Sequence, residues 1–181
     1  MTAVQGPAAD RSAEIDEAFT RMVAQYQTAL ARMCMLHLRD RSATEDAVQE
    51  TFLKAYTHMD TFRSKSTERT WLMSIAINTC RDMNRSAWFR HTEKRITPED
   101  VNLSVPPQDE DALALAQAIR RLPARHREVI LLYYYQDLNI QEVAEVLHTA
   151  PSTVSKRLRQ ARDKLRLLID ADPIPAKGGA V

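Results

Sequence analysis

Glycine is almost absent from this sequence of 181 residues. Only three glycines occur, and none lies between Gly6 and Gly178. Tight β-hairpins usually place glycine in their turns, because glycine adopts positive φ angles without steric cost. A chain without glycine over this length is therefore expected to contain no hairpin sheet. We predict an all-α protein.

Long apolar runs and cysteines are also scarce. No segment approaches the ~20 apolar residues that span a bilayer, and the N-terminus lacks the basic and then apolar order of a signal peptide. Two cysteines, Cys34 and Cys80, are too few for a disulfide framework, and both lie within apolar helical patterns. We therefore expect a protein of the reducing cytoplasm, with no direct insertion into the membrane.

A metal or redox site would have to be built from Cys34, His37 and Cys80. The first two can share a helix face, but Cys80 belongs to another predicted helix, and no second Cys-x-x-Cys or HExxH pattern occurs. Burial in the core is the favoured interpretation of sparse cysteines, and a redox or metal role of these residues stays open. We predict no enzyme activity, no catalytic residues, no metal site and no cofactor.

Helical periodicity appears in two separate parts of the sequence. Apolar residues recur at intervals of three and four over residues 15–33, from 42 to 60 and over 71–83, and Ser42 and Glu45 have the spacing of a capping box. A second series begins at residue 113 and continues to 168. The pattern therefore predicts two sets of helices.

Residues 91–111 separate the two sets. They contain three prolines among acidic residues, so backbone donors are missing and like charges repel, which is typical of an extended linker. Residues 1–12 and 171–181 also lack periodicity, and we expect both ends to be disordered. The sequence thus predicts two small helical domains, 13–90 and 112–170, joined by an acidic, proline-containing linker.

The second domain ends in a predicted helix-turn-helix. Asn139 and Glu142 have the spacing of a helix cap before a short helix over 140–147. A turn at 148–150 follows, and then a helix from Pro151, whose apolar stripe lies opposite a face rich in lysine and arginine. Asp163 is the only carboxylate between residues 151 and 168. This is the arrangement that enters the major groove of duplex DNA. His148 stands where a turn commonly has glycine, so either strain or an alternative turn is expected there.

Motifs in both domains resemble those of the extracytoplasmic-function (ECF) sigma factors of the sigma-70 family. The first domain carries Asp46 to Tyr56, Phe62-Arg63, Thr70-Trp71-Leu72 and Ile75 to Asn78; the second carries Leu122-Pro123, Arg127-Glu128-Val129, Ile140 to Ala144 and Ser152 to Arg162. The resemblance extends over roughly residues 13 to 169 in the family's order. It implies an alternative sigma factor that binds RNA polymerase core and directs promoter-specific transcription initiation, as in stress responses.

The resemblance also implies a set of contact residues. Those matching the family's contact with a coiled coil of the largest polymerase subunit are Asp46, Gln49 and Glu50. Those matching the surface that melts the minus-ten element are Arg63, Ser64, Lys65, Ser66, Asn78, Arg81 and Arg85. Those matching the contact with the minus-thirty-five element are Ser155, Lys156 and Arg159 on base edges, and Thr153, Arg157 and Arg162 on phosphates.

Further partners follow from the same resemblance. It implies promoter DNA and an anti-sigma factor, a protein that holds such sigma factors inactive. A helix-turn-helix regulator that never contacts polymerase is the alternative function. The motif from Asp46 to Tyr56 argues against that alternative, because such a regulator has no need of it.

Overall fold

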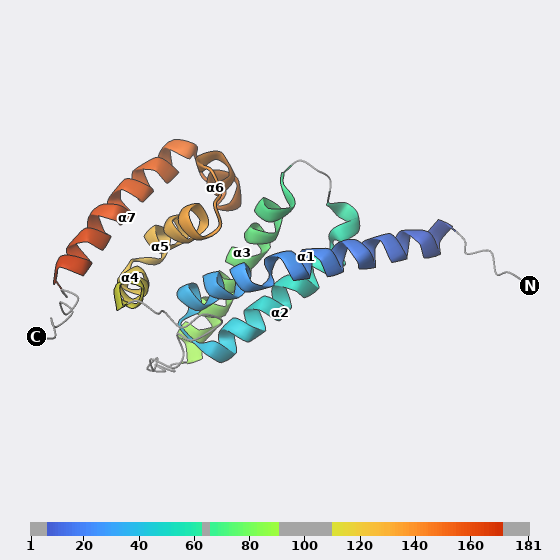
Figure 1. Ribbon diagram of the computed structural model, residues 1–181, viewed down its shortest axis with the longest axis horizontal. Helices are drawn as coiled ribbons and strands as arrows, with labels where there is room; N and C mark the ends of the chain where they lie inside the picture. The colour runs from blue at the N-terminus through green and yellow to red at the C-terminus, as the bar shows by residue number, and fades with distance from the viewer. Residues whose placement is uncertain (1–6, 63–65, 91–109, 172–181) are drawn as a thin grey trace, which may run out of the picture.

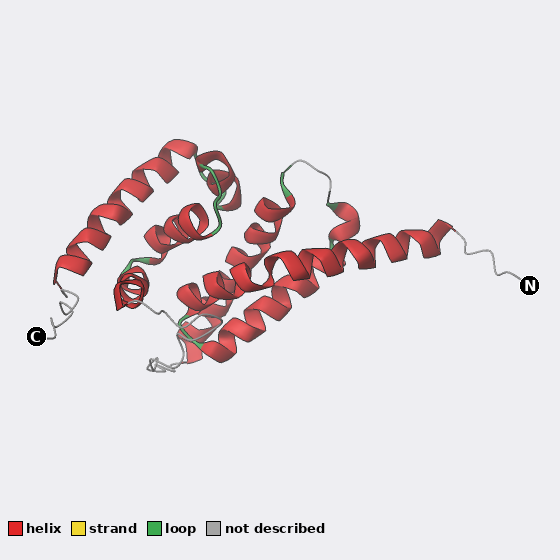
Figure 2. Cartoon of the chain, viewed as in Figure 1, coloured by secondary structure: helices red, strands yellow, loops and turns green. Residues whose placement is uncertain are grey.

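The computed structural model describes residues 7–62, 66–90 and 110–171, and every regular element within these ranges is helical (Figures 1 and 2). The all-α prediction is confirmed for this part of the chain. In order, the elements are α1 (Pro7–Leu38), α2 (Arg41–Thr57), the 3₁₀ turn η1 (Met59–Thr61), α3 (Glu68–Arg90), α4 (Glu110–Arg121), α5 (Ala124–Ile130), the π-helical turn η3 (Leu131–Tyr135), α6 (Ile140–Val146) and α7 (Pro151–Ala171).

Helices α1, α2 and α3 form the first helical unit. They pack against one another around side chains that are withdrawn from solvent, including Met22, Leu30, Leu72 and Ile77. Burying such side chains supplies most of the stability of a small domain. Helix α1 begins at Pro7, earlier than the sequence boundary at residue 13, because proline fits the first turn of a helix. The start of α1 projects beyond α2 and α3 (Figure 1).

The cap of α2 differs from the predicted capping box. Arg39 has a φ of 63°, which ends α1 and leaves Asp40 extended, so that Asp40 Oδ1 accepts a hydrogen bond of 2.7 Å from the Ala43 N–H. Glu45 pairs instead with Arg41, at 3.1 Å. The prediction of Ser42 as the cap is therefore wrong. The N-cap lies two residues earlier than predicted, at Asp40, and the helix begins at Arg41.

Helices α4 to α7 form the second helical unit, and α7 runs along one side of it (Figure 1). Leu122 and Val129 are buried on either side of Pro123, which precedes α5. Ala144 and Val154 are also buried, where α6 and α7 pack closely. The small side chain of Ala144 permits this close approach.

The two helical units are in contact. Helix α3 packs against α6, and α1 packs against α4, α5 and η3, so the buried apolar cluster continues from one unit into the other. The predicted linker lies outside the described residues except at its end, where α4 already begins at Glu110. Of the expected C-terminal tail, 171–181, Ala171 is described and ends α7, and the following residues also lie outside the described ranges.

Candidate polymerase and promoter interfaces

The helix-turn-helix is built from α6, a turn and α7. Asn139 caps α6: its side chain accepts from the Glu142 N–H at 3.0 Å, and the Glu142 carboxylate accepts from the Asn139 N–H at 2.9 Å. After α6, His148 takes a φ of 49°, and the Thr149 N–H donates to the Ala144 carbonyl at 2.9 Å. Both the predicted cap and the predicted strain at His148 are confirmed. The turn thereby fixes the angle between α6 and α7.

Helix α7 has a buried apolar stripe and an exposed basic face. The predicted stripe is confirmed, because Val154, Leu158, Ala161 and Leu165 are all buried. Of the residues predicted to contact the minus-thirty-five element, most are exposed and two are half-buried: Ser155, Lys156, Arg159 and Arg162 are exposed, whereas Thr153 and Arg157 are half-buried. Long cations on an exposed face are able to reach base edges and phosphates.

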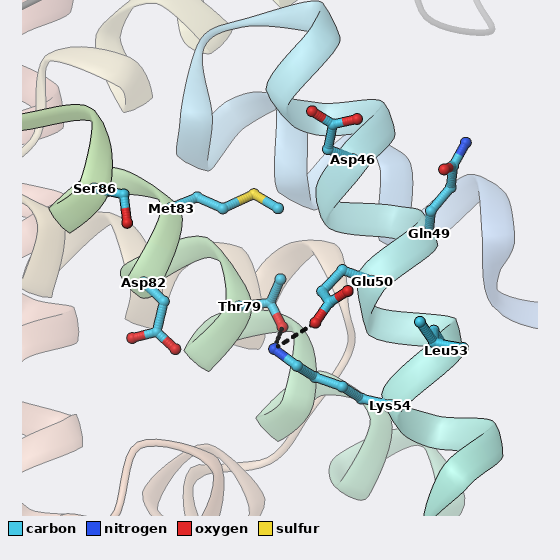
Figure 3. A pocket seen from close by; sticks show the side chains of 9 residues that line it. All are labelled: Asp46, Gln49, Glu50, Leu53, Lys54, Thr79, Asp82, Met83 and Ser86. Carbon is cyan, nitrogen blue, oxygen red and sulfur yellow. Dashed lines mark hydrogen bonds and ion pairs between the residues drawn. The ribbon is translucent and has the colours of Figure 1, made fainter. Parts of the chain in front are cut away.

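The predicted polymerase contacts line an open groove between α2 and α3 with a volume of about 570 Å³ (Figure 3). Asp46, Gln49 and Glu50 contribute from α2, and the opposite wall comes from Thr79, Asp82, Met83 and Ser86 of α3. Lys54 bridges the two helices by bonding Glu50 at 3.2 Å and Thr79 at 3.3 Å. Leu53 on the same rim is 60% exposed. The groove therefore offers a partner both carboxylates and the apolar side chains of Leu53 and Met83.

The predicted minus-ten residues do not form one free surface. Arg63, Ser64 and Lys65 lie outside the described residues, and Ser66 is half-buried before α3. On α3, Asn78 and Arg85 are exposed, with Arg85 paired to Asp82 at 3.5 Å. Arg81 turns toward the second helical unit. The structure therefore places Arg81 against the second helical unit, with Asn78 beside it at 3.5 Å.

Arg81 forms a two-pronged ion pair with Glu128 of α5. Its Nε donates to Glu128 Oε1 at 2.9 Å and its Nη2 to Oε2 at 2.8 Å. His37 of α1 contacts the same Oε1 at 3.4 Å through Nε2, and its Nδ1 lies 3.2 Å from the Asn84 amide. We call these four residues the Glu128 cluster. Parallel hydrogen bonds between guanidinium and carboxylate are among the strongest in proteins.

The cluster keeps Glu128 ionised although the residue is only 4% exposed. Burial by itself raises the pKa of a carboxyl group, but hydrogen bonds from His37 and Arg81 outweigh it and hold the pKa of Glu128 at about 2. The hydrogen bonds to Glu128 in turn raise the pKa of Arg81. At neutral pH the pair is fully charged.

Arg127, the neighbour of Glu128, is buried in a structural role. Its Nη1 donates to the carbonyls of Arg120 and Leu122 at 3.1 Å, and Arg39 also donates to the Arg120 carbonyl. Burial, together with the nearby charge of Arg39, lowers the pKa of Arg127 to about 10, so it remains a cation at neutral pH. A cation at the C-terminal end of α4 satisfies carbonyls that the helix leaves unpaired.

Sequence reasoning missed the Glu128 cluster. A signal was present, since Arg127 and Glu128 stand directly before the apolar run Val129 to Leu132. All residues from His126 to Ile130 are buried. Periodicity finds apolar stripes, but it does not identify the partner of a buried charge on a distant helix.

The cysteines lie in the core of the first helical unit. Their sulfur atoms are 3.6 Å apart, both are free thiols and both are fully buried. Hydrogen bonding to Cys80, together with burial, raises the pKa of the Cys34 thiol. In the described ranges, no group of three or more His, Cys, Asp or Glu side chains is placed to hold a metal ion, and no helix is long and apolar enough to cross a bilayer.

Family comparisons match both helical units. Sigma-70 region 2 matches residues 22–90, and sigma-70 region 4 matches residues 112–165. The ECF RNA polymerase sigma factor SigL of Mycobacterium tuberculosis is 32% identical over 93% of this chain and 96% of its own length. The chain belongs to the ECF sigma factors of the sigma-70 family. It is thus an alternative sigma factor, a DNA-binding factor that directs transcription initiation.

Other relatives and solved structures agree with this assignment. SigW of Bacillus subtilis, also an ECF sigma factor, is 28% identical over 83% of this sigma factor and 88% of its own length. CnrH, solved with the cytosolic domain of CnrY, superposes with a TM-score of 0.67 at 29% identity, over 87% of this chain and 90% of that one. RpoE of Bartonella quintana, solved with the anti-sigma factor NepR, shares the fold with a TM-score of 0.74 at 23% identity, over 86% and 99%.

Proposed function

We propose that this sigma factor binds RNA polymerase core through the α2–α3 groove, using Asp46, Gln49 and Glu50. The observation that supports this most directly is the groove itself, whose α2 wall carries these residues within the segment that matches region 2. A regulator that never contacts polymerase has no need of region 2. The match therefore favours a sigma factor over the alternative function.

Contact with the promoter is assigned to both units. Helix α7 enters the major groove of the minus-thirty-five element, with Ser155, Lys156 and Arg159 toward the bases and Thr153, Arg157 and Arg162 toward phosphates. The free basic face of α7 supports this role. Residues on α3 and before it contact the minus-ten strand: Arg63, Ser64, Lys65, Ser66, Asn78, Arg81 and Arg85.

Regulation and location follow from the relatives. The structure of CnrH was solved in complex with the cytosolic domain of CnrY, and that of RpoE in complex with the anti-sigma factor NepR. We infer that an anti-sigma factor also binds this chain, and that the chain acts in the cytoplasm, where polymerase and the genome lie. Its role is to direct polymerase rather than to catalyse a reaction.

Core binding tests the proposed function. A variant with Asp46, Gln49 and Glu50 all changed to alanine is expected to lose association with purified core polymerase, measured by pull-down, while its helical content by circular dichroism stays the same. The matched control changes Glu14, Glu17 and Gln25 of α1, all exposed, to alanine. Exposed substitutions each alter stability by ~0.5 kcal/mol or less. Equal core binding by both variants would place the interface elsewhere.

A further inference from the structure

The two helical units share a buried apolar cluster and the contact of Arg39 with the Arg120 carbonyl, and two further sets of polar contacts join them. The first is the Glu128 cluster, in which α5 contacts both α1 and α3. At the second, the Arg69 guanidinium donates to the Gln136 carbonyl at 3.0 Å and the Gln136 amide donates to the Ala29 carbonyl at 3.0 Å. Thr70 completes this second place by donating to the Glu142 carboxylate at 3.2 Å. Together these contacts join α1 and α3 to α5, η3 and α6.

Such contacts are suited to an interface that opens. Interfaces between domains of one chain are usually more polar than permanent ones, and relative motion of the domains is the ordinary expectation. A carboxylate and a guanidinium that separate regain their hydration, which offsets part of the lost ion pair. A substitution that neutralises one partner costs more than separation, because the other charge is then left buried without a partner. Glu128 and Arg81 are therefore the sensitive point of the interface.

The closed arrangement involves a residue assigned to the promoter. The Nε–Nη2 edge of Arg81 is bonded to both oxygens of Glu128, and its Nη1 lies 3.5 Å from Asn78 Oδ1. A DNA phosphate binds arginine through the same edge and with the same two-pronged geometry. Glu128 and a phosphate of the minus-ten strand therefore cannot occupy Arg81 in this way at the same time.

The other promoter surface remains accessible. Lys156, Arg159 and Arg162 of α7 are exposed in the same conformation. The contact between the two units thus occupies Arg81 of the first unit and leaves the predicted duplex contacts of α7 exposed.

We propose that Glu128 is an intramolecular latch, which closes the free chain by occupying Arg81 and must release it before Arg81 contacts the minus-ten strand. This inference rests on the proposed promoter role of Arg81. The ligand that competes with the latch is the phosphate backbone of a DNA strand. The depressed pKa of Glu128 supports the latch, because its carboxylate is charged at neutral pH.

Opening is measured on the full chain by small-angle X-ray scattering. Glu128→Gln is compared with Glu145→Gln, which removes the same charge at an exposed position of α6. Losing hydrogen bonds to charged partners is expected to raise the ratio of open to closed molecules by about tenfold or more. The radius of gyration should then increase for Glu128→Gln and stay unchanged for Glu145→Gln. Unchanged scattering by a folded Glu128→Gln would overturn the latch.

A second variant covers the case in which Glu128→Gln loses its fold. Arg81→Gln breaks the same pair from α3, outside the second helical unit, and should open the chain as well. If Arg81→Gln retains its helical content by circular dichroism and remains closed, the latch is excluded.

Competition is measured by fluorescence anisotropy with a labelled single-stranded oligonucleotide of mixed sequence. We expect Glu128→Gln to bind about tenfold more tightly than Glu145→Gln, in proportion to the open fraction. In an Arg81→Ala background, Glu128→Gln should not increase the DNA affinity further, because the residue for which Glu128 and DNA compete is gone. If Glu128→Gln opens the chain but does not increase DNA affinity through Arg81, Glu128 and DNA do not compete for Arg81. Failure of the proposed function would appear separately, as absence of core binding by the unmodified chain, and would leave the scattering result unaffected.

Discussion

At the scale of single residues, three non-glycine residues in the described part of the chain have left-handed backbone angles. Arg39, Asp137 and His148 have φ values of 63°, 49° and 49°. Each lies in a turn between helices, where a glycine would meet the geometry without steric cost. None of the three side chains enters this region without a contact between its Cβ and the backbone, so each position would gain from glycine.

Replacing His148 with glycine should therefore stabilise the second helical unit. Removing the contact between Cβ and the backbone is expected to raise the free energy of unfolding by about 1 kcal/mol, measured by urea denaturation. The matched control is Glu145→Gly in the preceding helix, where glycine should lower it by about 1 kcal/mol. A loss of stability in both variants would show that His148 makes a contact that offsets its strain.

Two residues of α7 separate promoter discrimination from folding. Arg159 is exposed, so Arg159→Ala should keep its melting transition but lose ~1–3 kcal/mol of discrimination at one or two base pairs, measured by binding to promoter variants. Val154 is fully buried, and Val154→Asp should unfold the second helical unit because the carboxylate has no partner there. If Arg159→Ala instead weakened binding equally to every DNA sequence, Arg159 would be a phosphate contact.

At the scale of elements, periodicity predicted the helices well and their ends less well. The stripe of α7 and the Asn139–Glu142 cap followed from spacing alone, because both are local. The cap of α2 did not, since it depends on the backbone angle of Arg39, which spacing does not reveal. Helix α5 was the hardest case, because its buried charges have partners on other helices.

The capping box of α6 gives a test at this scale. Asn139→Ala removes the side chain that accepts from the Glu142 N–H, and should lower the free energy of unfolding by about 1 kcal/mol. Gln141→Ala, at an exposed position of the same helix, should change it by ~0.5 kcal/mol or less. Equal stability of the two variants in urea would mean that the box contributes little to α6.

At the scale of the whole molecule, the sequence predicted two helical domains but not their contact. Glu128 belongs to a family motif of the second domain, and Arg81 matches the family's minus-ten surface in the first. Their pairing depends on how the domains pack, and long-range packing leaves no periodic signal in either segment. The polymerase and promoter residues stay predictions, whereas the exposure that such roles require is present for Asp46, Gln49 and Arg159.

The charge of Glu128 should make the stability of the chain depend on acid pH. Its carboxylate faces His37 of α1, Arg81 of α3 and Arg127 of α5, and its pKa is about 2 in the folded chain against an ordinary 4.5. A lowered carboxyl pKa stabilises the folded chain fully above the ordinary value, and this stabilisation is lost as the pH falls toward 2. We expect the difference in free energy of unfolding between the unmodified chain and Glu128→Gln to be constant near pH 5.5 and to shrink below about pH 4.5, by up to about 3 kcal/mol. Urea denaturation of both proteins over this range measures it, and a difference that stays constant down to about pH 3 would contradict an ionised, paired Glu128.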